Sequence, residues 1–188
     1  MSEANLILRA RLGDGAAWTE LVREHQQAVF RLAYLLLGDS DEADDVAQET
    51  FIRAFRSLDR FDVERPPRPW LLRIASNLAL NRRRAAGRYL SALQRLLWAG
   101  PEPAGVRMPE ESLPAGEADT LWRALRRLSA TDQQVIYLRY FLELSVAETA
   151  EAMETAPGTV KSRLNRALNR LREVIEREFP GLWKERIA

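Results

Sequence analysis

The stretch PGTVKSRLNRALNRLR, Pro157–Arg172, predicts a helix with two unlike faces. Pro157 suits the first helical position, where its missing N–H is not needed. At about 100° per residue the apolar side chains form one stripe: Val160, Leu164, Ala167, Leu168 and Leu171. The opposite face carries Ser162, Asn165, Arg166 and Asn169, with Lys161, Arg163, Arg170 and Arg172 on its flanks. This face suits a DNA major groove, where polar groups meet base edges and cations meet phosphates. A solvated basic face on an ordinary surface helix is the alternative.

The residues before this helix predict a helix-turn-helix unit. Thr131 with Gln134, and Ser145 with Glu148, have the spacing of capping boxes and mark two helix starts. We expect helices over about 132–143 and 146–153, followed by a turn at 154–157. The expected buried residues are Val135, Ile136, Leu138 and Tyr140 or Phe141 in the first helix, and Val146, Ala147, Ala150 and Met153 in the second.

The run LSATDQQVIYLRYFLELSVAETAEAMETAPGTVKSRLNRAL, residues 128–168, resembles region 4 of bacterial RNA polymerase sigma factors of the extracytoplasmic-function (ECF) group. The segment TVKSRL is its most specific part. The resemblance implies that the −35 promoter duplex is contacted by Lys161, Ser162, Arg163, Asn165 and Arg166. Four positions depart from the family pattern: Ser129 replaces a usual proline, Glu154 a frequent glycine, Thr155 an aliphatic residue and Ala156 a capping serine.

Composition bounds the remaining possibilities. The chain has 188 residues, 46% of them hydrophobic, which suits one or two small globular domains. The net charge of +1 hides an acidic segment at 39–49 and basic segments at 65–88 and 155–172, a partition that indicates one basic and one polyanionic partner. Cysteine is absent and the single histidine, His25, is interpreted as structural, so no metal site or cofactor is predicted. Neither a signal peptide nor a membrane-spanning run is visible, which predicts a cytoplasmic protein without membrane insertion.

The first half of the chain predicts a helical bundle. Residues 4–37 indicate two helices separated near Gly13–Gly15, and Gly38 is a plausible stop. A further helix should reach about Leu58, with a buried stripe of Ala43, Val46, Ala47, Thr50, Phe51, Ala54, Phe55 and Leu58. Its other face carries Asp41, Asp44, Asp45, Gln48, Glu49 and Ile52. Acidic first turns also complement the helix dipole, so a merely solvated face is the alternative.

The run DEADDVAQETFIRAF, residues 41–55, resembles sigma region 2.2, which docks on the largest subunit of core RNA polymerase. The resemblance places Asp45, Gln48 and Glu49 against the polymerase. Residues at these spacings share one helical patch, which can pair with arginines on a partner helix.

A proline-rich loop at Asp59–Pro69 precedes a helix expected over about 70–84. Trp70, Arg73, Asn77, Asn81 and Arg84 recur at helical spacing, a mixture that suits single-stranded nucleic acid. Alternatively, Trp70 belongs to the core. Residues 60–84 resemble ECF regions 2.3 and 2.4, which implies that this helix contacts the opened −10 element, while the loop holds a flipped base and Arg82–Arg84 hold phosphates.

Together these features predict an all-α protein of two small helical domains, residues 1–98 and 117–188, joined by a flexible Pro/Gly-rich linker at 99–116. The role of the apolar segment Tyr89–Trp98 is left open. The resemblance implies an ECF sigma factor: not an enzyme, but a protein that lends promoter recognition to core RNA polymerase and has an anti-sigma factor as a further partner. A helix-turn-helix regulator that acts without polymerase is the alternative, as is a helical interaction module with solvated charges.

Overall fold

The computed structural model describes residues 2–97 and 117–180, with side chains at 2–88 and 120–180. The chain is helical throughout these ranges and contains no strand within them, which confirms the all-α prediction. Its contacts divide it into two compact units, Met1–Met108 and Pro109–Ala188. The linker expected at 99–116 and the side chains of Tyr89–Trp98 lie outside the described residues, so the boundaries 1–98, 99–116 and 117–188 stay predictions.

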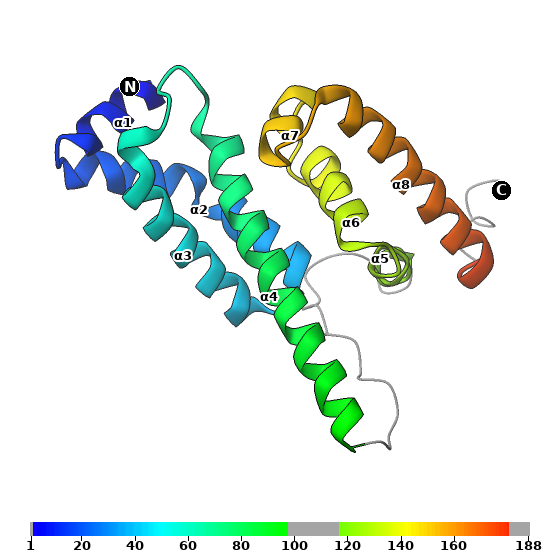
Figure 1. The fold of residues 1–188 in the computed structure, drawn as a ribbon. Helices are drawn as coiled ribbons and strands as arrows, with labels where there is room; N and C mark the ends of the chain where they lie inside the picture. Colours follow the sequence, from blue (N-terminus) through cyan, green and yellow to red (C-terminus); the bar gives the residue numbers. More distant parts are fainter. Residues whose placement is uncertain (1, 98–116, 181–188) are drawn as a thin grey trace. The chain divides into compact units, whose positions relative to one another are not determined.

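The first unit consists of α1 (Glu3–Arg11), α2 (Gly15–Leu37), α3 (Ser40–Ser57), a 3-10 turn η1 (Leu58–Arg60) and α4 (Pro67–Leu97) (Figure 1). Helix α2 packs against α1, α3 and α4, and α3 also packs against α4. Leu21, Leu32, Leu71 and Leu72 are fully buried in this bundle. Burial of such side chains contributes about 1.5–3 kcal/mol each, so the bundle gives α4 a rigid base.

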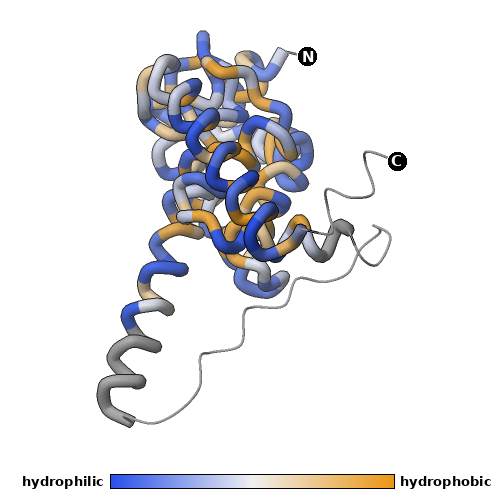
Figure 2. Tube along the Cα trace, turned by 90° about the vertical axis from the view of Figure 1, so that its right-hand side faces the viewer, coloured by the Kyte–Doolittle hydropathy of each residue, from blue (hydrophilic) through white to orange (hydrophobic). Residues whose placement is uncertain are grey.

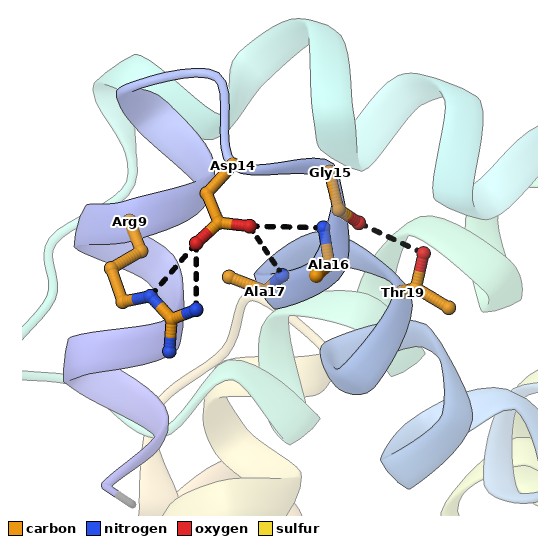
Figure 3. Close-up of polar contacts among 6 residues, drawn as sticks. All are labelled: Arg9, Asp14, Gly15, Ala16, Ala17 and Thr19. Carbon is orange, nitrogen blue, oxygen red and sulfur yellow. Dashed lines mark hydrogen bonds and ion pairs between the residues drawn. The ribbon is translucent and has the colours of Figure 1, made fainter.

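Asp14 joins the end of α1 to the start of α2 (Figure 3). Its Oδ1 accepts hydrogen bonds from the N–H groups of Ala16 and Ala17, at 3.0 and 3.1 Å. Its Oδ2 accepts two more from Arg9, 2.9 Å from Nε and 2.6 Å from Nη2. These bonds lower the pKa of Asp14. The predicted break near Gly13–Gly15 is therefore confirmed, with Gly13 at φ +89°.

The ends of α2 and α3 follow the sequence signals. Gly38 has φ +77° and its N–H bonds the carbonyl of Tyr34, which confirms the predicted stop. Asp39 caps α3 by accepting from the N–H of Glu42 at 2.9 Å. The expected buried stripe of α3 is confirmed except at Phe55, which is 53% exposed. Its ring lies at the edge of the bundle, 5.2 Å from the ring of Trp18.

Helix α4 begins at Pro67, earlier than expected, and continues beyond Arg84 to Leu97. Its second half extends past the ends of α2 and α3 (Figure 1). Hydrophilic residues recur along this projecting part (Figure 2). Arg82 and Arg83 are half-buried, and Arg84 and Arg88 are exposed. The helix therefore carries a cationic segment next to the bundle.

The second unit consists of α5 (Glu117–Arg126), α6 (Ala130–Ile136), a π-helical turn η2 (Tyr137–Phe141), α7 (Val146–Ala152) and α8 (Pro157–Glu178). Helix α8 packs against α5, α6 and α7, which confirms the helix-turn-helix arrangement. Leu125, Val135, Leu138, Leu144 and Val160 form its apolar centre. Helix α8 is longer than the predicted Pro157–Arg172, because Val174 continues the buried stripe.

Two details of the helix-turn-helix differ from the prediction. Ser129, not Thr131, caps α6 by accepting from the N–H of Asp132 at 3.2 Å. In η2 the N–H of Leu142 bonds the carbonyl of Tyr137, and this wider turn changes which side chains face inward. Tyr137 is consequently buried, whereas Tyr140 is 58% exposed. Of the two expected alternatives it is Phe141 that packs inward, half-buried against the rings of Trp122 and Tyr137.

Helix α7 starts as predicted, and its expected buried stripe is confirmed at Ala150 but wrong at Ala147. Ser145 and Glu148 form the expected capping box, with hydrogen bonds of 3.1 and 2.7 Å. Thr149 is buried and Ala147 is exposed, contrary to the expected stripe. Burial of Thr149 is possible because its hydroxyl donates to the carbonyl of Ser145 at 2.7 Å.

Candidate nucleic-acid interface

The polar face of α8 is exposed, as the sequence predicts. Its exposed members are Lys161, Ser162, Asn165, Arg166 and Asn169, whereas Arg163 is half-buried. Val160 and Ala167 on the opposite side are fully buried. The polar side chains bond mainly within the helix: Ser162 donates to the carbonyl of Thr159, and Arg166 Nε to that of Ser162. These contacts hold the polar groups on an open surface where DNA can exchange them for base and phosphate contacts.

Arg170, which flanks the polar face of α8, forms an ion pair with a residue of another helix. Its Nη1 lies 2.6 Å from Oδ2 of Asp132 on α6, whose side chain is only 5% exposed. The sequence placed Arg170 among the cations that flank the polar face, and the structure shows that this exposed side chain also joins α8 to α6. No local signal indicates this pairing, because 38 residues separate the partners.

Helix α4 presents amides and guanidinium groups along its exposed side. Asn77, Asn81 and Arg84 are exposed, and Arg73 is half-buried. Trp70 is different, because only 6% of it is exposed. Its ring packs on that of Phe61, with centroids 4.4 Å apart. Trp70 therefore packs in the core, which is the alternative that the sequence left open, and its contact with DNA stays a prediction.

The loop before α4 is anchored at both ends. Phe61, Pro67 and Pro69 are buried, whereas Asp62, Glu64 and Arg65 are exposed. Arg11 of α1 donates from Nε to the carbonyl of Leu58 at 2.9 Å and from Nη2 to the carbonyl of Phe61. Sequence reasoning missed Arg11, because it precedes these carbonyls by 47 and 50 residues. The anchors leave a short segment with exposed side chains directly before α4.

The acidic face of α3 is open, but its groups already have partners. Asp45 and Gln48 are exposed and Glu49 is half-buried. Gln48 Nε2 donates to Asp44 at 2.8 Å, and Arg53 lies 2.7 Å from Glu49. The hydrogen bond from Arg53 lowers the pKa of Glu49, so Glu49 stays ionised well below neutral pH. This patch offers negative charge and an amide to a basic partner.

A third group of charges surrounds His25. Its Nε2 lies 2.9 Å from Oε1 of Glu3, and with Glu24 these donor atoms lie within 4.8 Å of one another. Arg68 lines the same pocket and disfavours an added cation there. Burial lowers the pKa of His25 and outweighs the two carboxylates, which act to raise it. We assign the group a structural role that joins α1 to α2.

Comparison with known proteins places this arrangement in a family. The model of sigma-70 region 2 matches residues 21–89, and that of sigma-70 region 4 matches residues 118–171. The ECF RNA polymerase sigma factor SigW of Bacillus subtilis is 33% identical over 174 residues, which cover 89% of this chain and 93% of that protein. The chain belongs to the ECF sigma factors. Its function is accordingly promoter-directed initiation of transcription with RNA polymerase.

Other relatives of this sigma factor match it over similar lengths. SigL of Mycobacterium tuberculosis is 35% identical over 173 residues, covering 89% of this chain and 93% of that protein. The RNA polymerase sigma-H factor of Pseudomonas aeruginosa is 32% identical over 190 residues, covering 97% and 96%. Both described units of the sigma factor therefore have counterparts in the same order.

Solved structures show the same fold. CnrH, solved with the cytosolic domain of CnrY, has a TM-score of 0.69 at 26% identity, covering 94% of this chain and 98% of that chain. The sigma factor RpoE, solved with the anti-sigma factor NepR from Bartonella quintana, has a TM-score of 0.62 at 28% identity, covering 84% and 94%. Among the described residues of this sigma factor, no helix has the length and apolar content needed to cross a bilayer.

Proposed function

We propose a division of labour between three exposed faces of this sigma factor. Asp45, Gln48 and Glu49 on α3 dock on core RNA polymerase. Arg73, Asn77, Asn81 and Arg84 on α4 contact the opened strand of the −10 element. The polar face of α8, with Lys161, Ser162, Arg163, Asn165 and Arg166, contacts the −35 duplex.

The observation that carries this proposal is the separation of charge between α3 and α8. The first turns of α3 carry exposed carboxylates at Asp41, Asp44 and Asp45. The face of α8 from Lys161 to Arg166 exposes cations and short polar groups without an acid. An acidic surface repels DNA and suits a basic protein surface, whereas the α8 face suits a duplex. One molecule thereby has complementary surfaces for two different partners.

Helix α4 supports the −10 assignment through its amides. Exposed Asn77 and Asn81 are four residues apart and therefore lie on one side of the helix. Amide groups both donate and accept, which suits the edges of unpaired bases. The neighbouring Arg84 supplies an exposed cation for the backbone. With Trp70 in the core, base stacking on α4 is not part of the proposal.

The partners and the class of activity follow from the family. We expect an anti-sigma factor as a regulatory partner, supported by the RpoE relative that was solved with one. We also propose that the sigma factor acts in the cytoplasm, without cofactor or metal, and catalyses no reaction itself. RNA synthesis is then catalysed by the polymerase, and this chain binds the promoter and positions the polymerase on it.

Transcription in vitro with core RNA polymerase on a randomised promoter library tests the proposal. We expect transcripts only when both proteins are present, and two separated conserved elements among the selected templates. Binding to duplex DNA without any association with core polymerase would instead indicate a helix-turn-helix regulator. A salt-insensitive protein that binds no DNA would indicate an interaction module, since phosphate contacts make affinity fall steeply with salt.

A further inference from the structure

An ion pair between a buried carboxylate and an exposed guanidinium group connects α6 to α8. Asp132 lies in the first turn of α6, where its N–H bonds the hydroxyl of Ser129. Its carboxylate Oδ2 lies 2.6 Å from Nη1 of Arg170 on α8, and only 5% of the Asp132 side chain is exposed. Asp132 cannot contact DNA from this position. A buried carboxylate that loses its cationic partner is costly, so the pair constrains both helices.

One further ion pair contacts the far end of α8, where Arg127 Nε lies 3.0 Å from Glu178 Oε2. The contacts nearer the polar face constrain the orientation of α8 less. Ala156 offers no side-chain cap at the start of the helix, and Glu154 in the preceding turn has φ +50°. Val160 and Ala167 are buried by apolar packing, which is not directional. A charge-assisted hydrogen bond is directional and short, so it determines how α8 is rotated and tilted on α6.

We infer that Asp132 and Arg170 are positioning residues that set the angle at which α8 meets the −35 duplex. The inference rests on the proposed function of the α8 face. Ser162 precedes Arg170 by about two turns, or about 12 Å along the helix axis. A tilt of about 10° at Arg170 would therefore displace Ser162 by about 2 Å, more than a hydrogen bond tolerates. Arg170 acts by holding the helix and not by binding phosphate.

Whether Asp132→Ala strengthens or weakens DNA binding distinguishes a positioning role of the ion pair from a purely electrostatic role. Removing a negative charge from a DNA-binding domain strengthens its attraction to phosphates. Positioning predicts the opposite for Asp132→Ala, because the face of α8 loses its angle. Asp132→Asn removes the same charge but keeps an acceptor oxygen for Arg170, so it should lose less. Glu173→Ala is the matched control, because it removes an exposed carboxylate of α8 that no ion pair in the described structure uses.

The test uses holoenzyme reconstituted from core polymerase and the full-length chain, on a promoter selected from the library. The quantity measured is the ratio of binding to this promoter and to one with a scrambled −35 element and the same −10 element. We expect Asp132→Ala to lower this ratio about tenfold, which corresponds to one base contact. Asp132→Asn should lower it less, and Glu173→Ala should not lower it.

A double-mutant cycle tests whether the two residues act together. It adds the variant Arg170→Gln and the double variant Asp132→Ala with Arg170→Gln. If the pair acts as a unit, the double variant loses no more than either single variant. The dependence of log affinity on log salt should keep its slope in Arg170→Gln, whereas removal of a phosphate contact would reduce the slope by about 0.9. Urea titration verifies that each variant is folded, and Arg170→Gln decides the question if Asp132→Ala does not fold.

An unchanged or increased ratio in folded Asp132→Ala would overturn the inference, as would a reduced salt slope in Arg170→Gln. A wild-type holoenzyme that does not distinguish the two promoters would contradict the proposed −35 function instead. The two failures are thus distinguishable.

Discussion

Arg82 of α4 lies 3.4 Å from the carboxylate of Asp45 on α3, measured from Nη1 to Oδ2. The same Nη1 lies 3.4 Å from the carbonyl oxygen of Glu42. A residue of the basic segment of α4 thereby contacts a residue that we propose for polymerase docking. The side chains are 37% and 67% exposed, so such a pair contributes at most about 1 kcal/mol and can exchange for other partners.

The double variant Gln48→Ala with Glu49→Lys should weaken association with core polymerase. It removes an amide from the proposed docking patch and places a cation where a basic surface is expected to bind. Co-elution with core polymerase in size-exclusion chromatography measures the effect. Glu176→Lys, which reverses an exposed charge on α8, is the control and should co-elute like the wild type. Unchanged co-elution of the α3 variant would reject this surface.

Lys161→Ala with Arg166→Ala should weaken binding to the −35 element while leaving polymerase association intact. Both side chains are exposed on the polar face of α8, and removing a base-reading side chain should cost about 1–3 kcal/mol of binding free energy. Anisotropy of a labelled promoter bound to holoenzyme measures this change. Arg177→Ala removes an exposed cation near the far end of the helix and serves as the control. Equal binding by the double variant would count against the assigned face.

Trp70→Ala should destabilise the first unit by about 3–5 kcal/mol, because it leaves a cavity beside Phe61. Urea denaturation followed by circular dichroism provides the measurement. Asn77→Ala with Asn81→Ala is the matched comparison on the same helix: both side chains are exposed, so stability should change by at most about 0.5 kcal/mol each. The amide variant should instead impair promoter opening, detected with a fluorescent base in the −10 element. The reverse pattern would place Trp70 at the DNA and the amides in the core.

Glu154→Gly should stabilise the second unit by about 1 kcal/mol. Glu154 has φ +50°, a left-handed conformation that costs a residue with a Cβ atom roughly that amount. Thermal unfolding measures the change. Glu173→Gly, at an exposed position more than one turn inside the end of α8, should destabilise by about 0.5–1 kcal/mol, because glycine is a poor helix former. A loss of stability in Glu154→Gly would show that another contact of the turn compensates for its backbone conformation.

The stability of the first unit should decrease as the pH falls below 6.5, through His25. Burial lowers the pKa of His25 from its ordinary value of 6.5, so the unfolded chain takes up the proton first. The unfolded state therefore binds more protons between 6.5 and the lower folded pKa, and stability rises with pH across that interval. Glu3, Glu24 and Arg68 are the charged groups that face the ring.

Urea midpoints measured from pH 5 to 8 test this dependence. In His25→Gln the part of the slope just below pH 6.5 should disappear, whereas the loss of stability at lower pH, caused by carboxylates such as Asp14 and Glu49, should remain. An identical pH profile in the variant would show that His25 does not titrate with folding.

Local patterns in the sequence were enough to predict the helices, most of their buried faces and the family resemblance. Capping residues such as Asp39 and Ser145 act within three or four residues, and apolar periodicity on α3 and α8 depends only on helical geometry. These signals are local, so they could be predicted without knowing how the helices pack. The family motifs of α3 and α8 are also local, because each is a contiguous run of residues on one helix.

Which polar or aromatic side chains contact another element of the fold could not be predicted from one helix alone. Trp70 is buried because Phe61 folds back on it, Arg170 finds Asp132 on another helix, and Arg11 reaches carbonyl groups far along the chain. Such a side chain can either face solvent or contact another part of the fold. The packing of helices that are distant in sequence decides between these environments, and a pattern within one helix carries no information about it. The π-helical turn at Tyr137–Phe141 has the same origin, because an added residue per turn is set by how the helix packs and not by its propensity.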